Sequence, residues 1–295
     1  MDPEIEQKHI LAGTIASQAL YYGKSLLKPG VKVVDVLDKI ELKITELGGK
    51  PAFPAQISLN EVAAHHCAEL SYNVELQDQV IKLDVGVHID GYIADNALSV
   101  DLSGKYPELI KASKEALDAA IKTVRPGVKL GDIGKTVHEV ITSYGYAPVR
   151  NLSGHGLGHY KIHTAPSIPN FDNHNSTALK EGMAIAIEPF ASMGSGMIQE
   201  RPPASVFTFV KDAGVRDPIT RNILKEIKTY NGLPFAKRWL ERKFGSAKAS
   251  FALRNLERLE CLYAHPPLVD KGMVSQFEHS MIVKDKPLVF TRYEE

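Results

Sequence analysis

The chain has 295 residues, of which 44% are hydrophobic, so it can bury a substantial core. Lysine and arginine total 35, as do aspartate and glutamate, and this balance gives no overall field that would attract nucleic acid or an anionic membrane. Cys67 and Cys261 form no CxxC pair, which argues against a disulfide framework or zinc ribbon and favours a reducing, cytoplasmic setting. No apolar run approaches the ~20 residues of a membrane helix.

Amphipathic helices are predicted near the start of the chain and again near residue 120. The first helix ends at Pro29-Gly30, a second begins near Asp35, and the later helix ends at Pro126-Gly127. The apolar stripe of the first helix consists of Leu11, Ile15, Ala19, Tyr22 and Leu26.

Two segments of the chain resemble each other at a constant offset. Pro29-Gly30-Val31-Lys32 recurs as Pro126-Gly127-Val128-Lys129, which is 97 positions later, and the same offset relates Pro51 to Pro148. A register unbroken over about two dozen residues indicates an internal duplication. It predicts a pseudo-twofold fold with a site between the halves.

Short strands are predicted between the helices, so the fold class is α+β or mixed α/β. Between Arg221 and Tyr263 the pattern changes to helices only, with many basic residues around the apolar positions. We expect one domain over residues 1–295, with an inserted region at about 198–263 that contains a helical subdomain. The predicted strands span residues 80–87, 93–100, 183–187, 205–210, 281–283 and 288–290.

The most informative segment is a predicted β-hairpin that turns at Asp90-Gly91, a dipeptide suited to a two-residue turn. The register set by this turn places Asp84 and Asp95 on one face of the hairpin as diagonal neighbours, within reach of a shared pair of cations. Gly86 and Ala97, on the same face, are too small to fill the gap. Solvated surface acids are the ordinary alternative.

Other candidate ligands follow in the second half of the chain. His155 lies between glycines that allow close approach, and Glu188 ends an apolar strand, where a buried charge needs a partner. Glu278 and His279 point to opposite faces of a strand, so at most one reaches a given site. A flexible loop or a strand end in solvent would explain each residue singly, and the pair His65-His66 alone carries little weight.

Taken together, the five candidate ligands resemble the dinuclear metal site of the methionine aminopeptidases, which have the pita-bread fold. The resemblance covers nearly the whole chain, is closer to type II and archaeal members, and implies duplicated halves around a curved antiparallel sheet with a helical insertion. The ligands are Asp84, Asp95, His155, Glu188 and Glu278, and the type II motifs are residues 49–54, 151–155, 187–190, 233–240 and 276–279.

The resemblance implies removal of the N-terminal methionine from nascent proteins, by attack of a metal-bridging hydroxide on the first peptide bond. Asp84 would bind one of two divalent ions, and His155 with Glu188 would hold the other. Asp95 and Glu278 would bridge both. This oxygen-rich set suits Mn²⁺, Fe²⁺ or Co²⁺ at least as well as Zn²⁺.

The resemblance also implies catalytic roles. Glu188 would carry the proton from the attacking water to the leaving amine, and His65 and His163 would contact the substrate amide and stabilise the tetrahedral intermediate. We expect Gly86 and Ala97 to be small because metal ions occupy the space above them.

A methionine pocket is implied at Phe53 and Ile162, which match positions that line it in the family. The chain departs from the family at His265, where a tyrosine is common, so this side of the pocket is expected to be polar or pH-sensitive. A second departure is Cys67-Ala68-Glu69-Leu70, where Tyr-Thr-Pro often follows His65.

Two alternatives share this fold. A proline-specific Xaa-Pro metallopeptidase has the same five ligands but usually carries a large domain before them, whereas the first ligand here is already at Asp84. A non-catalytic RNA-binding or ribosome-binding relative would have lost ligands, and none is missing. We expect a cytoplasmic monomer that acts on nascent polypeptides, without membrane or specific nucleic acid, and contact of the basic insertion with the ribosome stays open.

Overall fold

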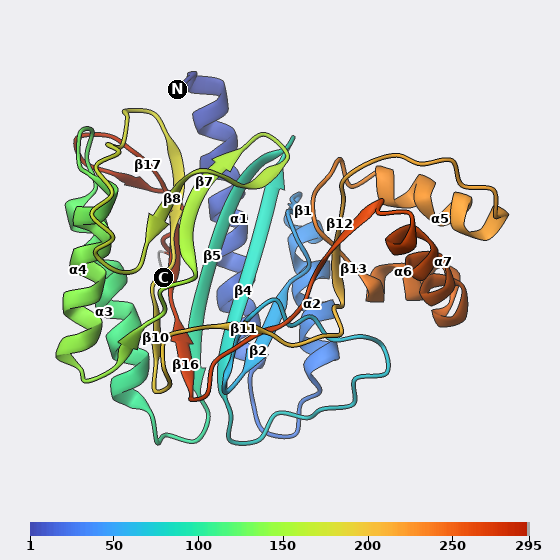
Figure 1. Ribbon diagram of the computed structural model, residues 1–295, viewed down its shortest axis with the longest axis horizontal. Helices are drawn as coiled ribbons and strands as arrows, with labels where there is room; N and C mark the ends of the chain where they lie inside the picture. Colours follow the sequence, from blue (N-terminus) through green and yellow to red (C-terminus); the bar gives the residue numbers. More distant parts are fainter. Residues whose placement is uncertain (294–295) are drawn as a thin grey trace.

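The computed structural model describes residues 1–293, in which helices and strands alternate along the chain as predicted (Figure 1). No helix in this range has the length and apolar character needed to cross a membrane. The helices are α1 (Pro3–Leu26), α2 (Val33–Glu46), α3 (Pro107–Thr123), α4 (Leu130–Ser143), α5 (Pro218–Lys228), α6 (Lys237–Phe244) and α7 (Ser246–Arg258).

A nine-stranded antiparallel sheet forms the centre of the molecule. Strands from the two ends of the chain are neighbours in it, which brings residues far apart in sequence together. Its order is β1 (Lys50–Pro51), β4 (Val80–Ile89), β5 (Tyr92–Asp101), β17 (Glu278–Ile282), β9 (Ala184–Ile187), β7 (Ser153–Gly158) and β8 (Lys161–Pro169), with β2 (Gln56–Leu59) beside β4 and β18 (Leu288–Val289) beside β17.

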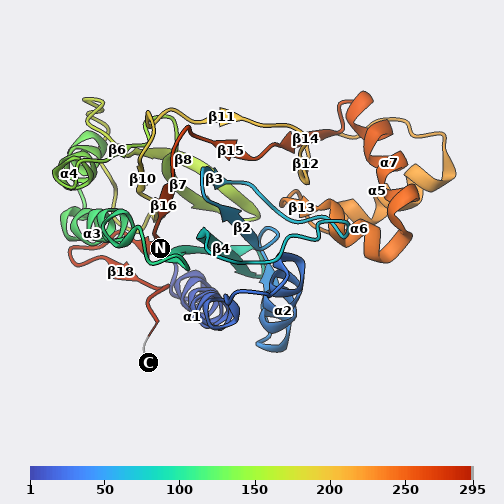
Figure 2. The same ribbon diagram turned by 90° about the horizontal axis from the view of Figure 1, so that it is seen from below.

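Three smaller sheets have three strands each. One of them consists of β12 (Val206–Phe209), β13 (Phe235–Ala236) and β14 (Leu262–His265). It packs with α5, α6 and α7 into a lobe at one end of the molecule, and this lobe has its own hydrophobic core (Figure 2). The expectation of helices only between Arg221 and Tyr263 was wrong, because β13 and the start of β14 lie there. The other two sheets consist of β6 (Ala147–Pro148), β10 (Phe190–Ser192) and β16 (Val274–Gln276), and of β3 (Val62–Ala64), β11 (Gln199–Glu200) and β15 (Leu268–Val269).

Helix α1 shows how sequence signals set the helix ends and the buried face. The Asp2 side chain accepts a hydrogen bond from the backbone N–H of Glu4 at 2.8 Å, and proline occupies the first helical position. Ile15 and Ala19 are buried as predicted, but Leu11 is 49% exposed. The buried face consists largely of alanine and glycine, and Leu11 lies outside it.

The internal duplication is confirmed by the helices themselves. Helix α4 begins and ends 97 residues after α2, and β6 follows β1 by the same number. The chain entering each helix is held in the same way: the backbone N–H of Gly30 donates to Leu76 and that of Gly127 to Leu179, both at 2.8 Å. The two halves therefore share the same order of helix and strand and the same contact at the start of the helix.

Each half has its own hydrophobic core against one face of the sheet. Helix α1 packs on β4 and β5, and α2 packs on α1, β1 and β2. Helix α3 packs near β9, β10 and β16, and α4 packs on β6 and β8. In Figure 2 α1 and α2 lie on one side of the sheet, and β11 and β15 lie on the other. The sheet face away from the helices is thus left free to carry polar side chains between the halves.

Candidate active site

The β4–β5 hairpin has the predicted register. Ile89 pairs with Tyr92 across the turn, Asp84 faces Ala97, and Asp95 faces Gly86. Leu83 and Val85, on either side of Asp84, point into the core below. The alternation of the strand therefore directs both carboxylates to the free face of the sheet.

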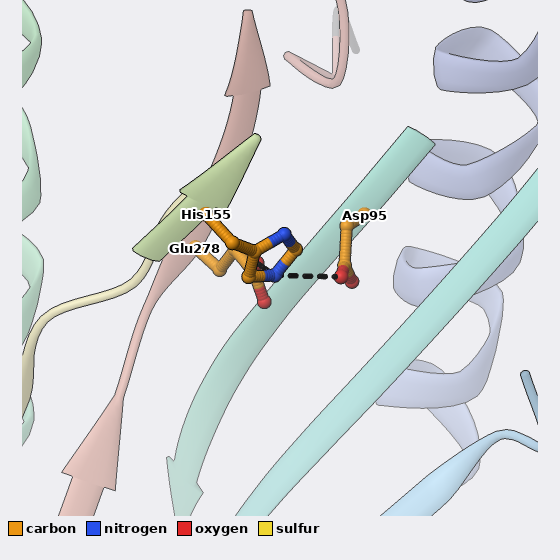
Figure 3. A group of neighbouring side chains, drawn as sticks. All are labelled: Asp95, His155 and Glu278. Carbon is orange, nitrogen blue, oxygen red and sulfur yellow. Dashed lines mark ion pairs between the residues drawn. The ribbon is translucent and has the colours of Figure 1, made fainter. Parts of the chain in front are cut away.

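The other three predicted ligands meet these aspartates from neighbouring strands. Glu278 begins β17 opposite Ala97, and His155 on β7 pairs with β9, which ends just before Glu188. The Nε2 atom of His155 lies 3.6 Å from Asp95 Oδ2, 3.8 Å from Glu188 Oε1 and 4.0 Å from Glu278 Oε1. Figure 3 shows the side chains of Asp95, His155 and Glu278 converging on one point from three strands.

The carboxylates of this cluster hold their protons unusually strongly. Burial raises the pKa of Asp84 to about 7. Burial, reinforced by the neighbouring acids, raises the pKa values of Asp95, Glu188 and Glu278 well above their ordinary range. Like charges this close cannot all ionise without a compensating cation.

The donor set fits a divalent cation. One buried carboxylate oxygen on each of Asp84, Asp95 and Glu278 has no hydrogen-bond partner within residues 1–293. Buried acceptors are rarely left unpaired, and hard oxygen atoms with one imidazole are ligands for Mn²⁺, Fe²⁺, Co²⁺ or Zn²⁺. Burial and the nearby His163 lower the pKa of His155 to about 3, so its ring is neutral, as a metal ligand must be.

A cavity of about 570 Å³ extends from this cluster. All the residues that the sequence suggested for metal binding, catalysis and the methionine pocket line this one cavity. They are Phe53, His65, Asp84, Asp95, His155, Ile162, His163, Glu188, His265 and Glu278.

Three histidines line the cavity beyond the carboxylates. The ring of His163 lies edge-on to that of His155, with centroids 4.4 Å apart, and the ring of His65 lies edge-on to that of His265 at 5.6 Å. His65 adopts a left-handed backbone conformation (φ 64°), and its Nδ1 atom is buried without a partner in the described part of the chain. A strained residue with an unused polar atom is typical of a binding site.

His265 bears on the expectation of a polar or pH-sensitive pocket wall. Its Nε2 atom lies 2.8 Å from the hydroxyl of Thr208, so this wall of the cavity is polar, as predicted. Burial, followed by the effect of His163, lowers the pKa of His265 to about 4. A pKa this low favours a neutral ring between pH 6 and 8, so the structure supports a polar wall and argues against titration of His265 in that range.

The explanation given for Gly86 was wrong. A Cβ atom on this residue would lie 2.1 Å from the ring of Phe53, so a side chain occupies space that was expected to hold no side chain, and the glycine makes room for that ring. The alternation predicted for Glu278 and His279 is confirmed, since Glu278 faces the cluster while His279 Nδ1 lies 2.9 Å from the Thr291 hydroxyl.

Two glutamines at the site had no role assigned from the sequence, although Gln276 belongs to the 276–279 motif. Gln56 on β2 lies opposite Asp84 and accepts a hydrogen bond from the backbone N–H of His65 at 2.8 Å. The amide of Gln276 donates to Glu188 Oε2 at 3.3 Å. For Gln56 the available signal was a polar residue within an apolar strand. Its role could be assigned only when the pairing of β2 with β4 was known.

Comparison with known proteins places this geometry in a family. The family model of metallopeptidase family M24 matches residues 7–225. A methionine aminopeptidase of Thermococcus onnurineus is 45% identical over 287 residues, which cover 96% of this chain and 97% of that protein. The chain belongs to the methionine aminopeptidases of family M24.

Solved structures agree with the M24 assignment at the level of the fold. A thermophilic Arx1 has a TM-score of 0.84 at 17% identity, covering 97% of this chain and 90% of its own. Methionine aminopeptidase from Thermotoga maritima has a TM-score of 0.71 at 22% identity, covering 99% and 98%. The curved sheet between duplicated halves is thus the expected pita-bread fold, and the clustered ligands of this M24 metallopeptidase indicate the use of divalent metal.

Proposed function

We propose that the protein removes the N-terminal methionine from peptides and nascent proteins with two divalent ions held by Asp84, Asp95, His155, Glu188 and Glu278. The convergence of all these side chains in one cavity is the observation that carries the proposal. Four carboxylates offset the charge of two divalent cations, whereas one cation would leave excess buried negative charge. The donor set favours Mn²⁺, Fe²⁺ or Co²⁺ at least as much as Zn²⁺.

The chain's own residues supply proton transfer and hydrogen bonds. Metal ions bound here would acidify water and polarise the scissile carbonyl. Glu188, held by Gln276, accepts a proton from the attacking water and delivers it to the leaving amine. His65 and His163 donate hydrogen bonds to the carbonyl oxygen as negative charge develops on it.

The cavity also selects the residue that is released. Phe53 and Ile162 are buried and apolar, which suits the unbranched thioether of methionine. His265 and Thr208 form a neutral polar wall beside them. The peptide's α-amino group would be held at the carboxylate cluster, which would limit cleavage to one residue.

An anaerobic metal-reconstitution assay tests this function. The metal-free protein is loaded with Fe²⁺, Mn²⁺, Co²⁺ or Zn²⁺, and free methionine is measured from Met-Ala-Ser, with metal stoichiometry determined in the same samples. We expect release with two bound ions per chain. No release with any metal would overturn the function, and faster cleavage of an Xaa-Pro peptide than of Met-Ala-Ser would favour a prolidase-type enzyme instead.

A second proposal concerns the lobe formed by α5, α6 and α7, which we take as the core of an insertion at about 198–263. Residues 211–260 contain 12 lysines and arginines against 6 aspartates and glutamates, a net charge of +6 (12 − 6). Lys237, Arg238 and Arg242 are compensated by acids outside this range, and the remaining excess favours transient contact of a cytoplasmic monomer with ribosomal RNA. Salt-sensitive co-sedimentation with ribosomes tests it, and unchanged sedimentation after reversal of the exposed charges would contradict it.

A further inference from the structure

We propose that the tips of two hairpins form a clasp that sets the width of the methionine pocket. The clasp consists of Asp90 and Gly91 at the β4–β5 turn with His159 and Tyr160 at the β7–β8 turn. The inference rests on the proposed function, because it assigns the clasp a role in substrate selection.

The two hairpins meet although they are not neighbours in the sheet. β17 and β9 lie between β5 and β7, so the ladder does not join the hairpins directly. Their tips nevertheless bond to each other where the ends of β4 and β5 approach the loop after β7 (Figure 1). The backbone N–H of Tyr160 donates to the Gly91 carbonyl at 2.9 Å, and His159 Nε2 lies 2.8 Å from the Asp90 carbonyl.

Ring packing at the tips leaves little freedom. A Cβ atom on Gly91 would lie 2.4 Å from the ring of Tyr160 and 2.8 Å from that of His159, so the two turns touch at backbone distance. His88 packs against Tyr160 with ring centroids 5.4 Å apart, and Tyr92 against His159 at 4.8 Å. Each tip thus holds the other through two hydrogen bonds and two ring contacts.

The clasp is connected directly to the walls of the cavity. Ile162 and His163 follow Tyr160 on β8, while Phe53 packs over Gly86 on the other hairpin. The distance between Ile162 and Phe53 therefore depends on how closely the tips meet. The metal ligands depend on it less, because strand pairing through β5, β17, β9 and β7 holds them independently.

Because different contacts hold the pocket walls and the metal ligands, opening the clasp should affect substrate binding without affecting metal binding. Opening the clasp should weaken the grip on the methionine side chain and admit bulkier residues. Metal affinity and the melting temperature of the loaded protein should change little. Loss of general structural integrity would instead lower kcat, metal affinity and melting temperature together.

The experiment compares five variants of the full chain, of which His159→Ala removes the ring that meets Asp90 and Tyr92. Tyr160→Ala removes the ring, whereas Tyr160→Phe retains it, and the hydroxyl has no hydrogen-bond partner within residues 1–293. Gly91→Ala pushes the tips apart, and Gly30→Ala is its matched control, since φ is similar (83° against 85°) but nothing lies within 4 Å of the added carbon. Steady-state kinetics are measured on Met-Ala-Ser and Leu-Ala-Ser, with metal binding by calorimetry.

We expect Tyr160→Ala and Gly91→Ala to raise KM for Met-Ala-Ser by about 10–100-fold and to reduce the preference for methionine over leucine, with a smaller change in kcat. Tyr160→Phe and Gly30→Ala should match the wild type. Should Tyr160→Ala fail to fold, Gly91→Ala and His159→Ala decide the matter. Unchanged KM and selectivity in these variants, with an active wild type, would overturn the clasp; an inactive wild type would overturn the proposed function instead.

Discussion

The two halves of the molecule share one plan but use one surface differently. In the first half Glu41, Thr45 and Pro51 line a cavity of about 430 Å³ that residues 229–239 cover. The residues 97 positions later, His138, Thr142 and Pro148, line a cavity of about 530 Å³ beside the loop at 192–197. The duplication therefore produced two equivalent clefts.

One substitution between the halves accounts for much of the difference. Glu41 accepts hydrogen bonds from Arg238 Nη2 at 2.6 Å and from Trp239 Nε1 at 2.8 Å, which ties the lobe to α2. The equivalent His138 is a poor partner for an arginine, and in its half Met193 and Met197 remain about half exposed. A repeated backbone surface thus becomes an anchor only where its side chain offers a buried negative charge.

The active site, in contrast, needs both halves. Asp84 and Asp95 come from the first half, His155 and Glu188 from the second, and Glu278 from β17, which lies between them in the sheet. The following predictions test this division between a shared site and an anchor found in one half, from the largest expected effect to the smallest.

Glu188→Gln should have the largest effect. The amide cannot transfer the proton and is a weaker metal ligand, so we expect kcat to fall by about 10²–10⁴-fold with the fold retained. Glu181→Gln, at an exposed position of the same half, is the control and should leave kcat unchanged. Single-turnover release of methionine with metal analysis gives the measurement, and near-normal kcat in Glu188→Gln would remove this residue from the mechanism.

Arg238→Ala should strongly destabilise the protein. The side chain is fully buried, and its loss removes the cation that compensates Glu41 and the hydrogen bond to Cys67 Sγ, which costs about 3–5 kcal/mol of unfolding free energy. His138→Ala, the matched change at the position equivalent to Glu41, should stay within about 0.5 kcal/mol. Urea denaturation measures both. Equal losses would show that the two clefts do not differ as described.

The stability of the metal-free protein should depend on pH because the carboxyl groups of the site titrate. The pKa of Asp84 is raised in the folded state, to about 7, so its contribution is fully present below the unfolded value near 4 and is lost as pH rises through about 7. Metal-free wild type should therefore lose more melting temperature than Asp84→Asn between pH 6 and 8.

Two controls sharpen that comparison. The lowered pKa values of His65 and His155 act in the opposite sense, because they reduce stability as pH falls below about 6.5. The wild type and Asp84→Asn share this effect, so it does not change the difference between them. Saturating Mn²⁺ should abolish the pH-dependent loss in the wild type by compensating the carboxylates. Parallel melting curves for the two metal-free proteins would contradict the raised pKa of Asp84.

The smallest effect is expected at His265. His265→Tyr, which introduces the residue common in the family, should change the ratio of kcat/KM for methionine and norleucine peptides by a few-fold, or under about 1 kcal/mol. Because the His265 pKa is lowered to about 4, this ratio should be constant between pH 6 and 8 in the wild type. A ratio that varies over that range would show that the ring titrates there.

Much of the site followed from the sequence because its signals are local. The Asp90-Gly91 turn fixes the hairpin register, and strand alternation then decides that Asp84 and Asp95 share a face while His279 leaves the site. The two Pro-Gly starts marked the duplicated helices with the correct offset. These features depend on backbone geometry over a few residues, which the sequence specifies directly.

Other features depend on contacts between distant segments. The packing of Phe53 over Gly86, the support of His65 by Gln56, and the short strand β13 in the lobe each require a partner far away in the chain. The state of His265 likewise depends on burial and on His163, and not on its neighbours in sequence. No local pattern specifies these partners.

The sequence by itself determined the ligand types, the hairpin that presents two of them and the repeated architecture. Only the tertiary structure decided that the ligands meet in one cavity, that burial lowers the pKa values of the imidazoles there, and that the hairpin tips touch across two intervening strands. The physical reason is that hydrogen-bond register and side-chain alternation are local properties of the backbone. Desolvation, pKa and close approach arise only when the sheet curves and brings both halves together.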